Sequence, residues 1–345
     1  MVGSPNLGSR RWVYRQYDQI VRGGTVVRCG SDAGVVCAPC EKDGKTLQKI
    51  LGFASDCNGR FAELDPFQGA AMAVAEACRN LAVTGAEPIG ITDCLNFGSP
   101  ERPEIMEQFA RAIDGMAAAC RALSVPVVSG NVSLYNETDG RAILPTPTIG
   151  AVGLVGKLED VTPAAFQRAG ETIVLFGPAG EGKLGGSEYV SCHTGQVKGP
   201  LPSLDLELEA KVQKLALELA RARLVTSMHD VSDGGLAIAL VECCVIADQP
   251  TAMVGADVTL PASNSDAVAA LFSEDPSRVI ASVPTAKLAE VKERAARAGV
   301  PLAELGTTTA KDVVLRRGGS ELVRATLDEL RDARENCLVP IVGGP

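Results

Sequence analysis

The sequence predicts an α+β fold in two domains, and three observations lead to this prediction. The chain has 345 residues, which is too long for one ordinary hydrophobic core and suits two. Short runs of β-forming residues alternate with segments in which apolar residues recur every three or four positions, as in a helix. A polar, proline-containing stretch separates two such groups, so we expect a domain at 1–156, a linker at 157–170 and a domain at 171–345.

The first domain is predicted to alternate strands and helices. Its β-forming runs predict strands at 24–28, 34–37, 50–53, 88–92, 125–128 and 148–155. Asp65 and Pro66 supply an N-cap and a first helical position for one helix, which Gly85 ends. The spacing of apolar residues predicts a second helix over 105–123. Polar loops are expected at 93–98 and 129–133, each directly after a strand.

The second domain is predicted to repeat the same kind of alternation. Strands are expected at 172–176, 224–228, 279–283 and 313–316, and helices at 204–223, 234–246, 265–271 and 286–298. A polar tail is expected to follow the last strand.

Composition excludes several classes of function. The formal charge of −9, with Lys and Arg scattered along the chain, argues against a nucleic-acid partner. No run approaches the roughly 18 apolar residues of a membrane span. Eleven cysteines, with no apolar run at the N-terminus, favour a reducing, cytoplasmic compartment without disulfides. Cys37 and Cys40 have CxxC spacing, but a second pair is missing, which argues against structural zinc.

A glycine-rich segment after the predicted strand 172–176 partly matches the motif of a phosphate-binding loop. Residues Gly177 to Lys183 match the first seven positions of that motif. Leu184, however, stands where a Ser or Thr hydroxyl is needed to bind magnesium. We therefore expect a glycine-rich turn.

Polar residues after two neighbouring strands are the first candidates for chemistry. Asp93 follows one strand, where a carboxylate can project into a cleft. Gly130, Asn131 and Ser133 follow the next, and they combine close backbone approach, an amide oxygen for a hard cation and a hydroxyl for phosphate or substrate. Each group could also be an ordinary turn.

Two further groups could bind a metal ion or phosphate. Glu76 and Asn80 are four residues apart on a helix, so they share a face and suit magnesium, although a solvated polar pair has the same spacing. In the segment 229–235, Asp230 is expected to point outward from a loop. Ser232 or Asp233 could cap the next helix, or Asp230 and Ser232 could bind phosphate or metal. For His229 we expect a structural role.

Several of these segments together resemble the formylglycinamidine ribonucleotide synthase family, in the second half of its large synthetase chain. The resemblance covers nearly the whole sequence, and its most specific strings lie at 92–98 (TDCLNFG) and 127–137 (VVSGNVSLYNE). The strings at 184–189 (LGGSEY) and 229–235 (HDVSDGG) are shared with the wider superfamily that includes aminoimidazole ribonucleotide synthetase.

The resemblance implies an aminoimidazole ribonucleotide synthetase-like architecture. It has a mixed α/β N-terminal domain that pairs across a pseudo-twofold axis and a C-terminal α/β sandwich. The activity implied for the complete enzyme is a step of purine biosynthesis. It converts formylglycinamide ribonucleotide to the amidine with ATP, Mg²⁺ and ammonia from a glutaminase subunit or domain.

The resemblance also assigns roles to individual residues. It makes Asp93 and Gly130 contacts to ATP, Asn131 a magnesium ligand and Ser133 a contact to the ribonucleotide substrate. The residues Glu76, Asn80, Asp230 and Ser232 match an auxiliary site for a structural nucleotide with magnesium.

The family's catalytic histidines, and a Glu and an Asp that bind magnesium, lie in the first half of the synthetase. No catalytic residue is therefore expected in this chain, which should be incomplete alone and should pair with a first-half polypeptide or with a second copy through its N-terminal domain. Two other functions stay open: a non-catalytic nucleotide-binding or assembly module, and a self-dimerising synthetase or kinase of the same superfamily.

Overall fold

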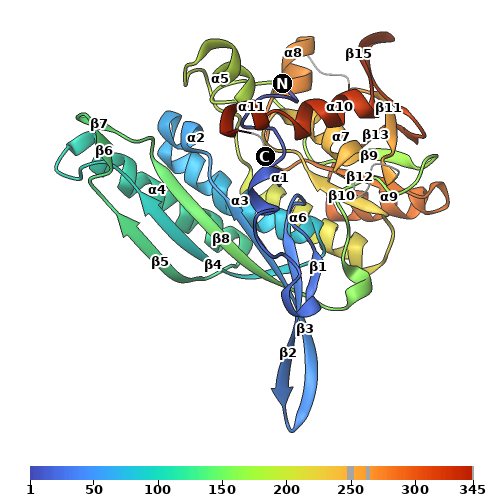
Figure 1. Ribbon diagram of the computed structural model, residues 1–345, viewed down its shortest axis with the longest axis horizontal. Helices are drawn as coiled ribbons and strands as arrows, with labels where there is room; N and C mark the ends of the chain where they lie inside the picture. The colour runs from blue at the N-terminus through green and yellow to red at the C-terminus, as the bar shows by residue number, and fades with distance from the viewer. Residues whose placement is uncertain (247–251, 262–264, 344–345) are drawn as a thin grey trace.

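Two β-sheets organise the chain, and helices pack on each of them (Figure 1). The computed structural model describes residues 1–246, 252–261 and 265–343. One sheet has six strands and is formed by the first part of the chain, and the other has seven strands and is formed by the second part. The predicted α+β fold class is confirmed.

The six-stranded sheet is mixed and has β5 at one edge. In spatial order its strands are β1 (Thr25–Val27), β2 (Gly34–Lys42), β3 (Lys45–Asp56), β8 (Thr146–Val155), β4 (Glu87–Asn96) and β5 (Val127–Ser133). Neighbours are antiparallel except β4 and β5, which run parallel. The β2–β3 hairpin projects away from the rest of the molecule (Figure 1). A small hairpin, β6 (Glu137–Thr138) and β7 (Arg141–Ala142), follows β5.

Helices cover one face of this sheet. They are α2 (Gly59–Leu64), α3 (Pro66–Val83) and α4 (Pro103–Leu123). As predicted, the Asp65 side chain caps α3 by accepting the backbone N–H of Phe67 and Gln68. Every second residue of β8 is buried against the helices. The opposite face is more open, and Phe53 on it is 45% exposed.

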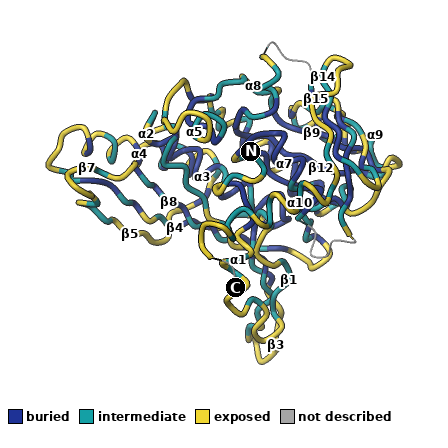
Figure 2. The backbone as a smooth tube through the Cα atoms, turned by 45° about the horizontal axis from the view of Figure 1, so that its top comes forward, coloured by how far each residue is buried: buried dark blue, intermediate teal, exposed yellow. Residues whose placement is uncertain are grey.

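Helices cover both faces of the seven-stranded sheet. In spatial order its strands are β10 (Ser227–Asp230), β12 (Val279–Val283), β9 (Thr172–Phe176), β13 (Leu302–Thr309), β11 (Gly255–Thr259), β14 (Asp312–Arg317) and β15 (Ser320–Thr326). One face packs on α6 (Leu206–Arg221) and α9 (Leu288–Ala298), and the other on α7 (Gly235–Val245) and α10 (Leu327–Glu335). Strands β9 and β12 are consequently buried along their whole length, as Figure 2 shows.

Short helices complete the described elements: α1 (Arg11–Tyr14), α5 (Glu188–Thr194), α8 (Ala267–Phe272) and α11 (Val339–Val342). The glycine-rich segment from Gly177 is irregular, and the next helix, α5, begins only at Glu188. A phosphate-binding loop would lead directly into a helix, so this segment is the turn that we predicted.

Three local predictions are wrong. The segments 93–98 and 129–133 are not simply loops, because β4 continues to Asn96 and β5 to Ser133, and their parallel pairing supplies the backbone hydrogen bonds. The expected polar tail contains β15 and α10, and Thr326 and Glu329 form a capping box at the start of α10. Strands β11 and β13 were not predicted at all.

The CxxC pair lies in β2, where residues three apart point to opposite faces of the sheet. All eleven cysteines are free thiols.

Candidate functional site

Asp93 and Gly130 lie opposite each other on the parallel strands β4 and β5. A Cβ atom placed on Gly130 would lie 2.6 Å from both carboxylate oxygens of Asp93. Burial raises the pKa of Asp93, and a backbone hydrogen bond from Asn131 opposes that rise. The absence of a side chain at Gly130 therefore makes room for the Asp93 carboxylate, and the two residues form one unit.

Asn131 and Ser133 point to the other face of the sheet. Side chains alternate along a strand, and Asp93 lies in the row of the buried residues Ile91 and Leu95. Asn131 pairs with Cys94 and Ser133 pairs with Asn96, in the alternate row. The structure thus brings all four candidates to two neighbouring strands, but it places them in two pairs on opposite faces.

The position of β5 makes both pairs accessible. It is the edge strand of its sheet, and Gly130 and Asn131 are exposed while Asp93 and Ser133 are partly buried. An edge strand also presents backbone N–H and C=O groups that no neighbouring strand uses. Both pairs can therefore be reached from the edge of the sheet.

The donors at this edge fit a magnesium ion that arrives with phosphate. Mg²⁺ in such sites takes one or two protein oxygens and completes its shell with phosphate oxygens and water, and the amide oxygen of Asn131 is a suitable ligand. In residues 1–246, 252–261 and 265–343, no group of three or more His, Cys, Asp or Glu side chains is placed to hold a metal ion. Among these described residues, a metal centre made of such side chains alone does not fit.

The candidate auxiliary residues are only partly brought together. Glu76 on α3 and Ser232 line one small cavity, together with Asp56 and Glu274. Asn80 is partly buried one turn further along α3.

The prediction that Asp230 points outward is wrong. Strand β10 extends through Asp230, which pairs with Val279 and is only 1% exposed. Ser232 and Asp233 do not cap α7 either, because the N-cap is Gly234, which adopts a left-handed conformation with φ +79°.

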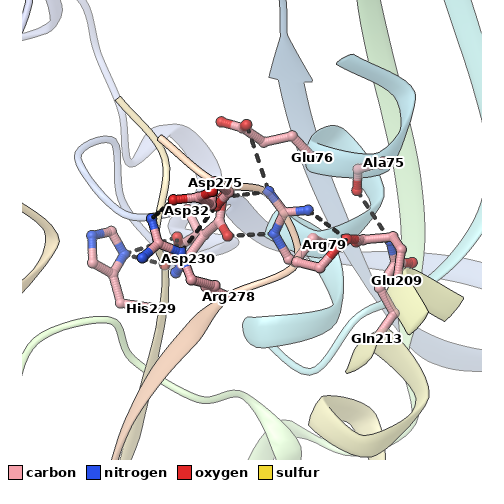
Figure 3. A network of polar contacts seen from close by, with 11 residues as sticks. Asp32, Ala75, Glu76, Arg79, Glu209, Gln213, His229, Asp230, Asp275 and Arg278 are labelled. Carbon is pink, nitrogen blue, oxygen red and sulfur yellow. Dashed lines mark hydrogen bonds and ion pairs between the residues drawn. The ribbon is translucent and has the colours of Figure 1, made fainter. Parts of the chain in front are cut away.

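Asp230 instead belongs to a buried cluster centred on Arg79 (Figure 3). The Arg79 guanidinium donates to both Asp230 carboxylate oxygens, and its Nη1 lies 2.9 Å from Oε2 of Glu209. Glu76 completes the cluster, with its Oε2 3.6 Å from Nη2 of Arg79. Burial alone would lower the pKa of Arg79, but the charges of Asp230, Glu209 and Glu76 outweigh burial and raise it well above its usual range.

His229 has the structural role that we expected. Its Nδ1 lies 2.9 Å from Oδ1 of Asp32, and its Nε2 lies 3.2 Å from Oε2 of Glu242. Burial would lower the pKa of His229, but the two carboxylates raise it well above its usual range. With both ring nitrogens engaged, His229 is not available as a general base.

Sequence reasoning missed Arg79, Glu209 and Asp32. A signal for Arg79 was present, because it lies on α3, whose residues are mostly small and apolar, and a buried arginine requires carboxylate partners. Those partners could not be named from the sequence, since Asp230 is 151 positions away and Glu209 is 130.

Glu274 should make the stability of the protein depend on pH. Burial and then the charge of Asp233 raise its pKa from 4.5 to about 8. A group whose pKa is higher in the folded state stabilises the fold below its unfolded pKa and loses that contribution as pH rises through its folded pKa. We expect the free energy of unfolding to fall between pH 4.5 and 8, and to fall less steeply in Glu274→Gln. Chemical denaturation across this range measures both slopes, and equal slopes would exclude Glu274 as the cause.

Comparison with known proteins identifies relatives of both sheet units, by which we mean each of the two sheets with the helices that pack on it. Residues 30–155 match the AIR synthase related protein N-terminal domain, and residues 168–317 match the C-terminal domain of the same family. The chain is 47% identical over 312 residues to phosphoribosylformylglycinamidine synthase subunit PurL of Anaeromyxobacter dehalogenans (strain 2CP-C), covering 89% of this chain and 41% of that protein. It is 44% identical over 346 residues to the PurL subunit of Sinorhizobium fredii, covering 100% of this chain and 44% of that one.

Solved structures show the same fold. Phosphoribosylformylglycinamidine synthase II of Thermotoga maritima matches with a TM-score of 0.72 at 18% identity, over 97% of this chain and 51% of that one. T. maritima PurL complexed with ATP matches with a TM-score of 0.66 at 20% identity, over 87% and 47%. The structure of PurLQS from T. maritima gives 0.64 at 19% identity, over 83% and 45%.

The chain therefore spans less than half the length of the curated relatives just named. Within the described parts of the chain, every helix is too short or too polar to cross a membrane.

Proposed function

The chain belongs to the AIR synthase-related family, and from this premise we propose that it is the second half of a phosphoribosylformylglycinamidine synthase. In this proposal it supplies one wall of the site for ATP and formylglycinamide ribonucleotide. The single observation that supports it most is the edge of the first sheet, where Asp93 and Gly130 pair beside Asn131 and Ser133.

The proposed reaction requires that an amide be activated. ATP transfers its γ-phosphoryl group to the amide oxygen of the substrate, so that an O–P bond forms and the bond between the β- and γ-phosphates breaks. Ammonia then forms the new C–N bond, and phosphate leaves with the former amide oxygen. Because charge develops on the transferring group, fixed donors at the site accelerate the first step.

Each candidate residue has a defined part in this proposal. Asp93 and the exposed backbone at Gly130 would contact ATP, Ser133 would contact the ribonucleotide, and Asn131 would hold magnesium through its amide oxygen. Magnesium bound there would neutralise charge on the phosphates. The partial exposure of these residues supports a site that a second polypeptide completes.

The open face of the first sheet supports a partner at this site. Phe53 is 45% exposed on that face, and its neighbour in the adjacent strand is Val152. We propose that a first-half synthetase polypeptide packs here and brings the catalytic histidines. A second copy of this chain could pack on the same face but would not supply them. A glutaminase subunit or domain would supply ammonia, in line with the PurLQS assembly of the T. maritima protein.

Asn131→Ala tests the proposed magnesium ligand. In the enzyme assembled with its partner half, the variant should raise the KM for magnesium-bound ATP about tenfold, as expected for one lost ligand, while the fold is retained. Ser129→Ala is the matched control, because Ser129 lies in the same strand and its hydroxyl bonds Thr92 at 2.7 Å. Steady-state kinetics at varied ATP measures this KM in both variants. Equal KM values for Asn131→Ala and Ser129→Ala would show that Asn131 does not bind the magnesium ion.

A further inference from the structure

The contacts of the auxiliary residues point to a cation other than magnesium. We infer that the guanidinium of Arg79 is the resident cation of the auxiliary site and that it excludes a divalent metal ion. The inference rests on the proposed function in one respect, because the resemblance to the synthase family defines which residues belong to this site. Its evidence comes from the contacts of Arg79.

Arg79 binds the carboxylate of Asp230, which is one of the predicted ligands of the auxiliary site. It donates to both oxygens of Asp230, with Nη2 3.3 Å from Oδ2 and with Nε bonded to Oδ1. Arg79 and Asp230 are each 1% exposed, so water does not separate them. The planar guanidinium donates several N–H groups in fixed directions, which matches the two oxygens of a carboxylate.

Glu209 is engaged in the same way. Its Oε2 accepts hydrogen bonds from Nη1 of Arg79 and from the hydroxyl of Ser277, and its Oε1 accepts one from Gln213 at 2.7 Å. Gln213 also donates to the backbone carbonyl of Ala75 at 3.0 Å. Glu209 is fully buried, and both of its oxygens already have partners.

The position of Arg79 opposes a metal ion between Glu76 and Asp230. Glu76, one of the predicted auxiliary residues, lies 3.6 Å from Nη2 of Arg79, so a metal ion bound between Glu76 and Asp230 would lie beside the guanidinium. Repulsion between like charges is strong where protein replaces water. Binding a divalent ion here would also require Asp230 to release Arg79, which would leave a buried charge without its partner.

The cluster joins the two sheet units. Arg79 is on α3, beside the first sheet, while Glu209 is on α6 and Asp230 is on β10 of the second sheet (Figure 3). The guanidinium of Arg79 therefore takes the place of a divalent metal ion in this cluster.

Manganese binding by the full-length chain tests this inference. Mn²⁺ serves as a probe for Mg²⁺, and electron paramagnetic resonance measures the free ion during titration. We compare the unmodified chain, Arg79→Ala and the double variant Arg79→Ala with Asp230→Asn. Arg79→Ala should gain a site at least about tenfold tighter than any in the unmodified chain, and the double variant should lose that gain. Equal binding by the unmodified chain and Arg79→Ala would overturn the inference.

A second variant covers the case in which Arg79→Ala does not fold. Glu76 is partly exposed, so Glu76→Gln should fold, and it should bind Mn²⁺ as the unmodified chain does. Mn²⁺ that is bound by the unmodified chain and lost in Glu76→Gln would overturn the inference. Mn²⁺ that is lost only in Asn131→Ala would be bound at the proposed ATP site on the edge of the first sheet, and not at the auxiliary site. If the assembled enzyme showed no turnover, the proposed function would be wrong. The Mn²⁺ binding results would still test the inference about Arg79.

Discussion

Replacing Asp230 with alanine is expected to lower the free energy of unfolding by about 3–5 kcal/mol, which is the largest effect on stability that we predict. The variant removes both oxygens to which Arg79 donates and leaves part of a guanidinium that is 1% exposed without a partner. Asp230→Asn should cost less, because one amide oxygen can still accept a hydrogen bond. Denaturant unfolding of the purified chain measures both changes.

An exposed ion pair provides the control for this prediction. Lys211 and Glu207 lie 2.6 Å apart on α6, and Glu207 is 80% exposed. Glu207→Ala should change the free energy of unfolding by no more than about 0.5 kcal/mol. A change in Asp230→Ala as small as that in Glu207→Ala would show that the buried cluster does not hold the two sheet units together.

Replacing Gly130 with alanine is expected to reduce ATP-dependent turnover of the assembled enzyme about 100-fold. The new Cβ would lie 2.6 Å from both carboxylate oxygens of Asp93, so either the carboxylate or the strand must move. Displacement of a substrate-positioning group by about 1 Å is enough for a loss of this size. Because β5 is an exposed edge strand, the fold should survive.

Gly34→Ala is the matched control. Gly34 is also a strand glycine, but a Cβ placed on it meets no atom closer than 4.0 Å. Both variants are compared by steady-state turnover in the presence of the partner half and by circular dichroism. Normal turnover in Gly130→Ala would show that the Asp93–Gly130 pair does not contact ATP.

The sequence was sufficient to predict the elements whose signals are local. Asp65 and Pro66 predict the start of α3, and short runs of β-forming residues predict most strands of both sheets. The polar strings at 93–98 and 129–133 predict loops, because polar residues with Gly and Asn are typical of turns. What makes them strands is the pairing of β4 with β5, a contact between residues 37 positions apart.

For the candidate site too, local signals were readable from the sequence and contacts between distant residues were not. Its residue types pointed to phosphate and metal chemistry, but the faces on which Asp93 and Asn131 lie depend on the register of the two strands. The outward position predicted for Asp230 failed because its partner, Arg79, lies in another sheet unit. A short polar motif between a strand and a helix does not reveal whether its carboxylate is exposed or forms a buried ion pair.

Formation of the amidine by this chain with and without a first-half synthetase polypeptide is the most direct test of the central claim. Ammonia replaces the glutaminase, and ATP and formylglycinamide ribonucleotide are supplied in both reactions. We predict turnover only in the mixture, with Asn131→Ala impaired in it. Turnover by this chain alone would contradict the account, because the site would then be complete without a first half.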